Sequence, residues 1–201
     1  MPGTGAIILA AGESKRFGQP KQLVQLEGVP LVRRIADHAR DAGCSPVIVV
    51  VGSEDQPGAS EVEGAAGLGG DTLIIVNEAW RSGIGSSIRA GVQLAATMPE
   101  VDGIILMVCD QPAVDHAILK KLISTRKQSA RDIVACAYAG TMGVPTLFTR
   151  ACFRELLQLP NDQGGKSIIL REPERVTTVS FEQGSLDIDT REDWDAFSKS
   201  V

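Results

Sequence analysis

Three basic side chains follow a turn of small residues near the start of the chain. Residues 6–9 form an apolar run that is typical of a buried strand, and the chain leaves it with almost no side-chain bulk. A turn of this kind lets a ligand reach backbone N–H groups, and nearby cations favour a polyphosphate. The turn consists of Ala10, Ala11 and Gly12, and the cations are Lys15, Arg16 and Lys21. The segment therefore predicts a nucleoside triphosphate as the ligand.

The spacing within this segment excludes two common phosphate-binding loops. A Walker loop has the pattern G-x-x-x-x-G-K-S/T, whereas here five residues separate Gly12 from Gly18 and Gln19 follows. A dinucleotide-binding loop needs G-x-G-x-x-G at the strand exit, which this turn lacks. The alternative to a phosphate site is a surface turn with ordinary basic residues.

The composition indicates a soluble globular protein that binds neither nucleic acid nor a membrane. Hydrophobic residues make up 43% of the 201 and charged residues 22%, which is usual for a folded domain. The formal net charge of −5 argues against coating nucleic acid, so the basic loop is a local exception. No apolar run approaches the ~20 residues of a spanning helix. The first strand begins almost at once, so we expect no signal peptide.

Cysteine and histidine are too sparse and too scattered for a zinc site. The four cysteines form no C-x-x-C pair, and there are only two histidines. Reduced thiols of this kind fit a cytoplasmic location. The cysteines are Cys44, Cys109, Cys136 and Cys152, and the histidines are His38 and His116.

Strand-like and helix-like segments alternate along the chain, which predicts one α/β domain over residues 1–201 with a mostly parallel sheet covered on both faces. After the first strand, we expect strands at 46–51, 72–76, 103–108, 133–137, 145–149 and 175–181. We expect helices at 30–42, 85–96, 115–126, 150–159 and from 190 onward. Asp115 is placed as an N-cap, and Thr190 with Asp193 forms a capping box that turns Trp194 and Phe197 toward the core. Residues 53–70 look irregular.

Asp110 is the first candidate metal ligand. It follows the predicted strand at 103–108, and Pro112 prevents that strand from continuing. Ligands of open α/β sheets bind beyond the carboxyl ends of strands, so this carboxylate is expected in the same cleft as the basic loop. Mg²⁺ bound to a triphosphate needs only one or two such carboxylates. The alternative is an aspartate that only forms a turn.

A second pair of acids occurs near the carboxyl end, at Asp187 and Asp189. Alternation along an extended chain puts both on one face, with Ile188 opposite. Either acid is a candidate metal ligand. The alternative is a turn before the last helix, where acids are favoured by the helix dipole.

Two further segments have the composition of ligand-binding helix starts. Gly83, Ser86 and Ser87 open the helix predicted at 85–96, where unpaired N–H groups and hydroxyls could contact a base. Plain N-capping by Ser86 and a core role for Trp80 are the alternatives. Residues 161–166 place two glycines before Lys166, which suits an anion, although a connecting turn explains the glycines equally well.

Together these segments resemble the MobA-like nucleotidyltransferases and, within them, the molybdenum cofactor cytidylyltransferases. The family pattern L-A-A-G-x-S-x-R-x-G-x-x-K matches Leu9, Ala10, Ala11, Gly12, Ser14, Arg16, Gly18 and Lys21. A second block matches from Val76 to Gly91, a D-x-P element matches Asp110 to Pro112, and a C-terminal block matches from Asp187 to Asp193. The likeness spans nearly the whole chain in the same order.

The resemblance implies a GT-A-like, Rossmann-related fold and Mg²⁺-dependent transfer of CMP from CTP to molybdopterin, with release of pyrophosphate. Ala11 stands where guanylyl-transferring relatives have glycine, which favours CTP. In this reading Arg16 and Lys21 contact the phosphates, with the backbone of Ala11 to Ser14. Asp110 and Asp189 hold Mg²⁺, Gly83, Ser86 and Ser87 frame the base, and Lys166 contacts the acceptor.

The chain departs from the family pattern mainly on the acceptor side. Val144 occupies the histidine position of the usual Gly-His-Pro, residues 161–166 replace Gly-Asp-x-Gly-Ala-Arg, Phe17 replaces a common methionine, and Gly85 replaces a frequent alanine. Two alternatives therefore remain. One is a nucleotidyltransferase acting on another phosphorylated acceptor. The other is a non-catalytic accessory protein that passes a nucleotide or pterin to a molybdenum hydroxylase. A nicotinamide oxidoreductase is disfavoured by the missing dinucleotide glycines.

Overall fold

The computed structural model describes residues 3–12, 14, 17–52, 62, 64, 67–69, 72–188 and 190–198. Most of the predicted irregular segment at 53–70 therefore lies outside the described residues. The strands are β1 (Gly3–Ala10), β2 (Gln25–Leu26), β3 (Val29–Pro30), β4 (Val47–Gly52), β5 (Thr72–Asn77), β6 (Val101–Val108), β7 (Ile133–Tyr138), β8 (Thr141–Thr149) and β9 (Val176–Ser180). The helices are α1 (Leu31–Asp41), α3 (Ile84–Ala96), α4 (His116–Gln128), α5 (Phe153–Leu157), α6 (Lys166–Arg171) and α7 (Arg191–Ser198).

Seven of the described strands form one sheet in the order β5-β4-β1-β6-β8-β7-β9, with β1 near its centre. The pairs β5/β4, β4/β1, β1/β6 and β7/β9 are parallel, whereas β8 is antiparallel to both β6 and β7. The mostly parallel sheet predicted from the sequence is confirmed. Of these seven strands, all except β8 consequently end at the same edge of the sheet.

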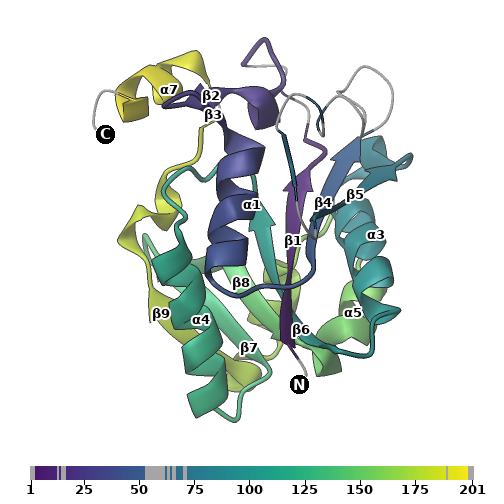
Figure 1. Ribbon diagram of the computed structural model, residues 1–201. Coiled ribbons are helices and arrows are strands. Elements are labelled where there is room, and N and C mark those ends of the chain that lie inside the picture. The colour runs from purple at the N-terminus through teal and green to yellow at the C-terminus, as the bar shows by residue number, and fades with distance from the viewer. Residues whose placement is uncertain are drawn as a thin grey trace.

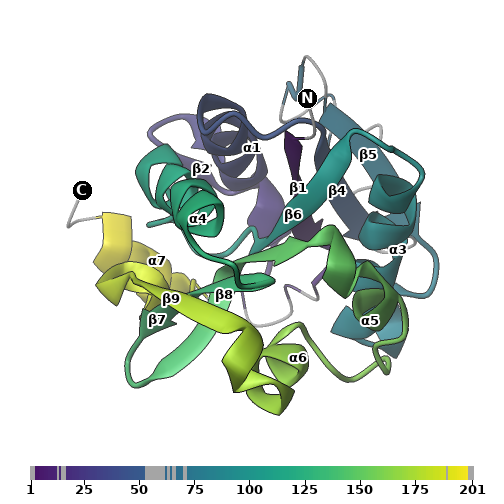
Figure 2. The ribbon, with the colours of Figure 1, turned by 90° about the horizontal axis from the view of Figure 1, so that it is seen from below.

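Helices cover both faces of the sheet, as Figures 1 and 2 show: α1 and α4 lie on one face, and α3, α5 and α6 on the other. Alternate residues of each strand point to opposite faces. In β1, Ile8 packs with the α1 and α4 side, and Ile7 packs with the α3 and α5 side. The central strands are buried on both faces, which explains their unbroken apolar sequences.

Short 3₁₀ helices connect several of these elements. The predicted helix at 150–159 divides into the 3₁₀ helix η3 (Arg150–Cys152) and α5, which ends at Leu157. The prediction was wrong about its length because a residue before a proline is disfavoured in the helical region, and Pro160 follows Leu159. The other 3₁₀ helices are η1 (Lys21–Leu23), η2 (Trp80–Ser82), η4 (Pro173–Arg175) and η5 (Glu182–Ser185).

The carboxyl-terminal helix packs beside β2 and β3 rather than on the main sheet (Figure 1). The predicted capping box is confirmed, because the Thr190 N–H donates to Asp193 Oδ2 at 2.8 Å and the Asp193 N–H donates to Thr190 Oγ at 3.2 Å. Trp194 and Phe197 are half-buried against a small separate cluster, so the expectation that they face the core is only partly met. That cluster consists of Phe17, Val24, Leu26, Leu31 and Ile188. None of the described helices is long and apolar enough to span a bilayer.

The predicted N-cap of α4 offers a direct test of the local sequence signals. The N–H of Ile118 donates to Asp115 Oδ1 at 2.9 Å. Asp115→Ala removes this acceptor, so we expect the free energy of unfolding in urea to fall by about 1 kcal/mol. Asp115→Asn keeps a side-chain oxygen and should retain most of the stability. Equal stability of the alanine and asparagine variants would contradict the capping role.

Candidate active site

The loops that follow β1 and β6 leave the sheet side by side. These two strands are parallel neighbours in register, with Leu9 opposite Val108, and the Cys109 N–H donates to the Leu9 carbonyl at 3.3 Å. The small-residue turn and Asp110 therefore meet at the carboxyl edge of the sheet. The sequence predicted this meeting from the expected central position of the first strand.

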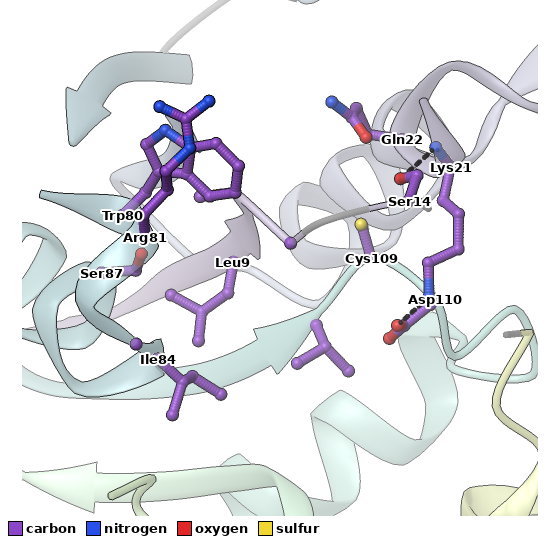
Figure 3. A pocket seen from close by; sticks show the side chains of 14 residues that line it. Leu9, Ser14, Lys21, Gln22, Trp80, Arg81, Ile84, Ser87, Cys109 and Asp110 are labelled. Carbon is purple, nitrogen blue, oxygen red and sulfur yellow. Dashed lines mark hydrogen bonds and ion pairs between the residues drawn. The ribbon is translucent and has the colours of Figure 1, made fainter. Parts of the chain in front are cut away.

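A pocket of about 400 Å³ opens between these loops and the start of α3 (Figure 3). It brings together many of the residues predicted from the sequence. Those lining the pocket are Leu9, Ala11, Gly12, Ser14, Lys21, Gly83, Ser87 and Asp110.

Some predicted residues lie away from the pocket wall. Ala10 is buried in the core and does not line the pocket. Ser86 is buried beneath the wall, and Lys166 is exposed at the start of α6. Arg16 and Asp189 lie outside the described residues.

Lys21 and Asp110 form an ion pair in the pocket. Lys21 Nζ donates to Asp110 Oδ2 at 2.9 Å, and the lysine backbone N–H donates to Ser14 Oγ at 3.0 Å. The exposed fraction is only 11% for the lysine side chain but 26% for the aspartate side chain. One side of the pocket thus holds the Lys21 ammonium, which is fixed by its ion pair, and the Asp110 carboxylate, which is still partly accessible to a ligand. A charge-assisted hydrogen bond between partly buried groups is strong. Removing either partner would leave the other charge partly buried and unpaired, which costs free energy.

Cys109 also lines the pocket, but it is unsuited to nucleophilic chemistry. Burial raises the pKa of its thiol to about 12, and the neighbouring carboxylate of Asp110 acts in the same direction. A thiol with this pKa is protonated at neutral pH and is a poor nucleophile. Among the described residues no three His, Cys, Asp or Glu side chains are grouped to hold a metal ion. A cation here would depend on Asp110, ligand phosphates and water, the pattern usual for Mg²⁺.

The opposite side of the pocket is organised by Asn77, at the end of β5. Its Nδ2 donates to Ser86 Oγ at 2.8 Å and to Ser87 Oγ at 3.0 Å, and its Oδ1 accepts from the Ala79 N–H at 3.0 Å. Ser86 is not the N-cap considered from the sequence, because α3 begins at Ile84 and Gly83 occupies the cap position. Ser86 therefore supports the wall, whereas Ser87 belongs to its surface.

Trp80 and Arg81 complete this side and were not predicted as site residues. Trp80 is buried, as expected for a core tryptophan, yet it also lines the pocket. The guanidinium carbon of Arg81 lies 5.0 Å from the centre of the Trp80 ring, a cation–π distance. Figure 3 shows both residues across the pocket from Lys21. In the sequence both residues fall within the second family block, from Val76 to Gly91, without a role assigned to them.

The start of α3 is packed tightly against the loop that precedes α6. The Gly85 N–H donates to the Asn161 carbonyl at 2.9 Å. A Cβ on Gly83 would lie 2.2 Å from that carbonyl oxygen, and one on Gly85 would lie 2.0 Å from the Pro160 oxygen. Arg89 adds hydrogen bonds to the Leu159 carbonyl and to Asn161 Oδ1. The loop at 160–163 is therefore part of the pocket's support and more than a connecting turn.

The segment at 184–188, which includes Asp187, lies beside Asp110 through hydrogen bonds to its backbone. The Ile188 N–H donates to the Asp110 carbonyl at 2.9 Å, and Gln111 Nε2 donates to the Gly184 carbonyl at 2.9 Å. Ile188 is buried and Asp187 is exposed, whereas Asp189, the other acid of the predicted pair, lies outside the described residues. The two bonds bring this segment to the loop that carries the pocket's carboxylate.

Comparison with known proteins agrees with this geometry. The MobA-like NTP transferase domain matches residues 6–176, which cover both strand exits and the start of α3. The chain belongs to this family. The resemblance seen in the sequence is thereby confirmed.

Three curated relatives show the range of named activities in the family. "Purine catabolism protein PucB" of Bacillus subtilis (strain 168) is 28% identical over 97% of this chain and 96% of its own. "Molybdenum cofactor cytidylyltransferase" of Escherichia coli (strain K12) is 26% identical over 96% and 95%. "Nicotine blue oxidoreductase" of Paenarthrobacter nicotinovorans is 33% identical, but the match spans 63% of this chain and only 59% of that protein.

Solved structures confirm the GT-A-like, Rossmann-type fold. Rv0371c from Mycobacterium tuberculosis H37Rv has a TM-score of 0.82 at 32% identity, over 98% of this chain and 97% of that one. A complex of Rv0371c with manganese has a TM-score of 0.76 at 30% identity, over 99% and 100%. A nucleotidyl transferase from Methanothermobacter thermautotroptrophicus (Mth528) shares the fold with a TM-score of 0.79, at 22% identity over 100% and 98%.

The tight contact at Gly85 leads to a stability prediction. Gly85→Ala places a methyl group against the Pro160 carbonyl, so we expect a loss of about 1–3 kcal/mol in the free energy of unfolding. Gly164→Ala is the matched control, because the nearest atom to its Cβ is an Ile84 methyl at 3.8 Å. It should change stability by less than about 0.5 kcal/mol. Urea unfolding of both variants measures the difference, and a Gly85→Ala protein as stable as the control would refute the contact.

Proposed function

We propose that this protein transfers CMP from CTP to the molybdenum cofactor, with release of pyrophosphate. The observation that carries the proposal is the Lys21–Asp110 pair at the exits of β1 and β6, inside a pocket bordered by the small-residue turn. A fixed ammonium, a partly open carboxylate and accessible backbone N–H groups suit a polyphosphate with a divalent cation. The end-to-end similarity to a molybdenum cofactor cytidylyltransferase supports the choice of acceptor.

The donor side of the pocket supports a pyrimidine nucleotide. Ala11 lines the pocket, and guanylyl-transferring relatives carry glycine at this position, so we assign CTP as the donor. We assign the base to the wall formed by Gly83 and Ser87. Ser86 acts indirectly there, since Asn77 ties its hydroxyl to that of Ser87.

Asp110 fits a Mg²⁺ ion, since its carboxylate is partly open and an oxygen ligand of this kind is what the ion prefers. Asp189 is the proposed second ligand, because its neighbour Ile188 is hydrogen-bonded to the Asp110 backbone. Mg²⁺ supplies charge neutralisation and orientation of the phosphates when bound.

The chain's own residues position the reactants. An oxygen of the acceptor's phosphate forms a bond to the α-phosphorus of CTP, while the bond from that phosphorus to the bridging oxygen breaks and pyrophosphate leaves. We assign Lys21 to the α-phosphate, where negative charge grows, and Arg16 to the β- and γ-phosphates. Backbone N–H groups from Ala11 to Ser14 hold the departing pyrophosphate, and Lys166 contacts the acceptor's phosphate. Catalysis then rests on positioning and electrostatic stabilisation.

The decisive assay measures pyrophosphate released with CTP, GTP, ATP or UTP, each with and without molybdopterin. We expect release that needs Mg²⁺ and molybdopterin and is fastest with CTP. Pyrophosphate release with CTP and a different phosphorylated compound would show that this compound, and not molybdopterin, is the acceptor. Nucleotide binding without any release would favour an accessory role.

Asp110→Ala serves as the internal control for that assay. We expect metal-dependent release to disappear while the unfolding transition remains cooperative, because the variant removes the proposed metal ligand. Asp102→Ala is the matched variant, since Asp102 lies at the start of β6, whose opposite end precedes Asp110. It should keep full activity. Undiminished release by Asp110→Ala would remove the metal assignment.

Lys21→Ala tests the second half of the ion pair. The lysine is assigned to charge that develops in the transition state, so kcat should fall by about 100-fold or more, with a much smaller change in the Kd for CTP. Steady-state kinetics and calorimetry separate the two effects. Lys120→Ala, an exposed lysine on α4, should match the unaltered protein. A change confined to KM would contradict the transition-state role.

A further inference from the structure

Gln22 is a buried amide in the wall of the pocket, and the family pattern assigns it no role. It follows Lys21 in the 3₁₀ helix η1, is 1% exposed, and lines the same pocket. Figure 3 shows its amide on the side of the pocket that carries Ser14 and Lys21, across from Trp80 and Arg81. Its place is therefore the phosphate side of the proposed nucleotide site.

The Nε2 donor of Gln22 has no hydrogen-bond partner within the described part of the chain. Buried polar groups are nearly always paired, and leaving one unpaired costs free energy. Asn77, the buried amide across the pocket, uses both its nitrogen and its oxygen. Three other buried side-chain atoms in the described residues lack partners, and none of their residues lines this pocket. They are Arg34 Nε, His38 Nδ1 and Gln111 Oε1.

The surroundings of Gln22 indicate the kind of atom that would satisfy this donor. An N–H needs an acceptor, and phosphate oxygens are strong acceptors that cannot donate when ionised. Lys21, the next residue in the chain, already directs its ammonium into the pocket. An uncharged donor beside it can bind a second oxygen without competing for the carboxylate of Asp110.

We propose that Gln22 Nε2 donates a hydrogen bond to a phosphate oxygen of the bound nucleoside triphosphate. This inference rests on the proposed function, and it adds a binding residue that the motif does not contain. The unpaired donor makes the site selective, because a ligand without an oxygen at this point leaves the amide unsatisfied. Gln22 thus discriminates for the triphosphate part of the ligand and not for the base.

The test compares Gln22→Met with the unaltered protein. Methionine has a similar length and no donor, so the fold should be kept and the thermal midpoint should stay the same or rise. Calorimetry with Mg²⁺-pyrophosphate and with Mg²⁺ and α,β-methylene-CTP should show Kd values about tenfold higher, the loss expected for one hydrogen bond to a charged group. Binding of cytidine, which has no phosphate, should not change.

Two further variants control for unspecific effects. Gln128→Met changes an exposed glutamine at the end of α4, far from the pocket, and should bind all three ligands as the unaltered protein does. Gln22→Glu places a carboxylate against the phosphates, so we expect a larger loss than with methionine.

A measurement on the unaltered protein keeps the proposal testable even if the variants fail to fold. The side-chain NH₂ signals of Gln22, assigned through the backbone, should move downfield in ¹H–¹⁵N NMR spectra when Mg²⁺-pyrophosphate is added, and should not move with cytidine. Unchanged amide signals, or a folded Gln22→Met protein with unchanged pyrophosphate affinity, would overturn the inference. An equal loss of affinity for cytidine would also overturn it. If the unaltered protein bound neither triphosphate nor pyrophosphate, the proposed function itself would fail and the inference with it.

Discussion

The parallel pairing of β1 with β6 is the constraint on which the pocket depends. Because Leu9 lies opposite Val108, both strands end at the same level, and the turn after one faces the carboxylate after the other. The short helix η1 then returns Lys21 to Asp110. A shift of this register by one residue would turn every side chain of β6 to the other face of the sheet. The close packing of their side chains against the helices on both faces opposes such a shift.

The pocket's two sides are held by different kinds of interaction. The phosphate side is fixed by charge, through the Lys21–Asp110 pair, and by the bond from the Lys21 N–H to Ser14. The other side is fixed by close backbone contact at Gly83 and Gly85 and by the neutral amide of Asn77. Binding a highly charged ligand can rearrange the first side, whereas the second has little room to adjust.

Sequence patterns predicted most of the fold because most of its strands and helix ends are determined by residues that are adjacent in the sequence. The apolar strands, the end of α1 at Asp41, shortly before Gly43 with its φ of +86°, and the N-cap at Asp115 each depend on a few adjacent residues. The meeting of Lys21 and Asp110 also followed from a general rule about strand ends. The contact of Gly85 with Pro160 could not be predicted, since it joins segments far apart in the sequence. The burial of Gln22 could not be predicted either, because it also depends on segments far apart in the sequence. Glutamine is a polar residue that is usually exposed.

The Ile188 N–H donates to the Asp110 carbonyl and Gln111 Nε2 donates to the Gly184 carbonyl, and these two bonds form only when the segment at 184–188 is present. The Gln111–Gly184 bond joins residues 73 positions apart. A ribosome delivers the strand exits and the basic loop long before it delivers the segment that supports Asp110. Contacts of such long range form late, because the loop between them must first be closed. The loop that carries Asp110 therefore gains these two bonds only after residues 184–188 have been made.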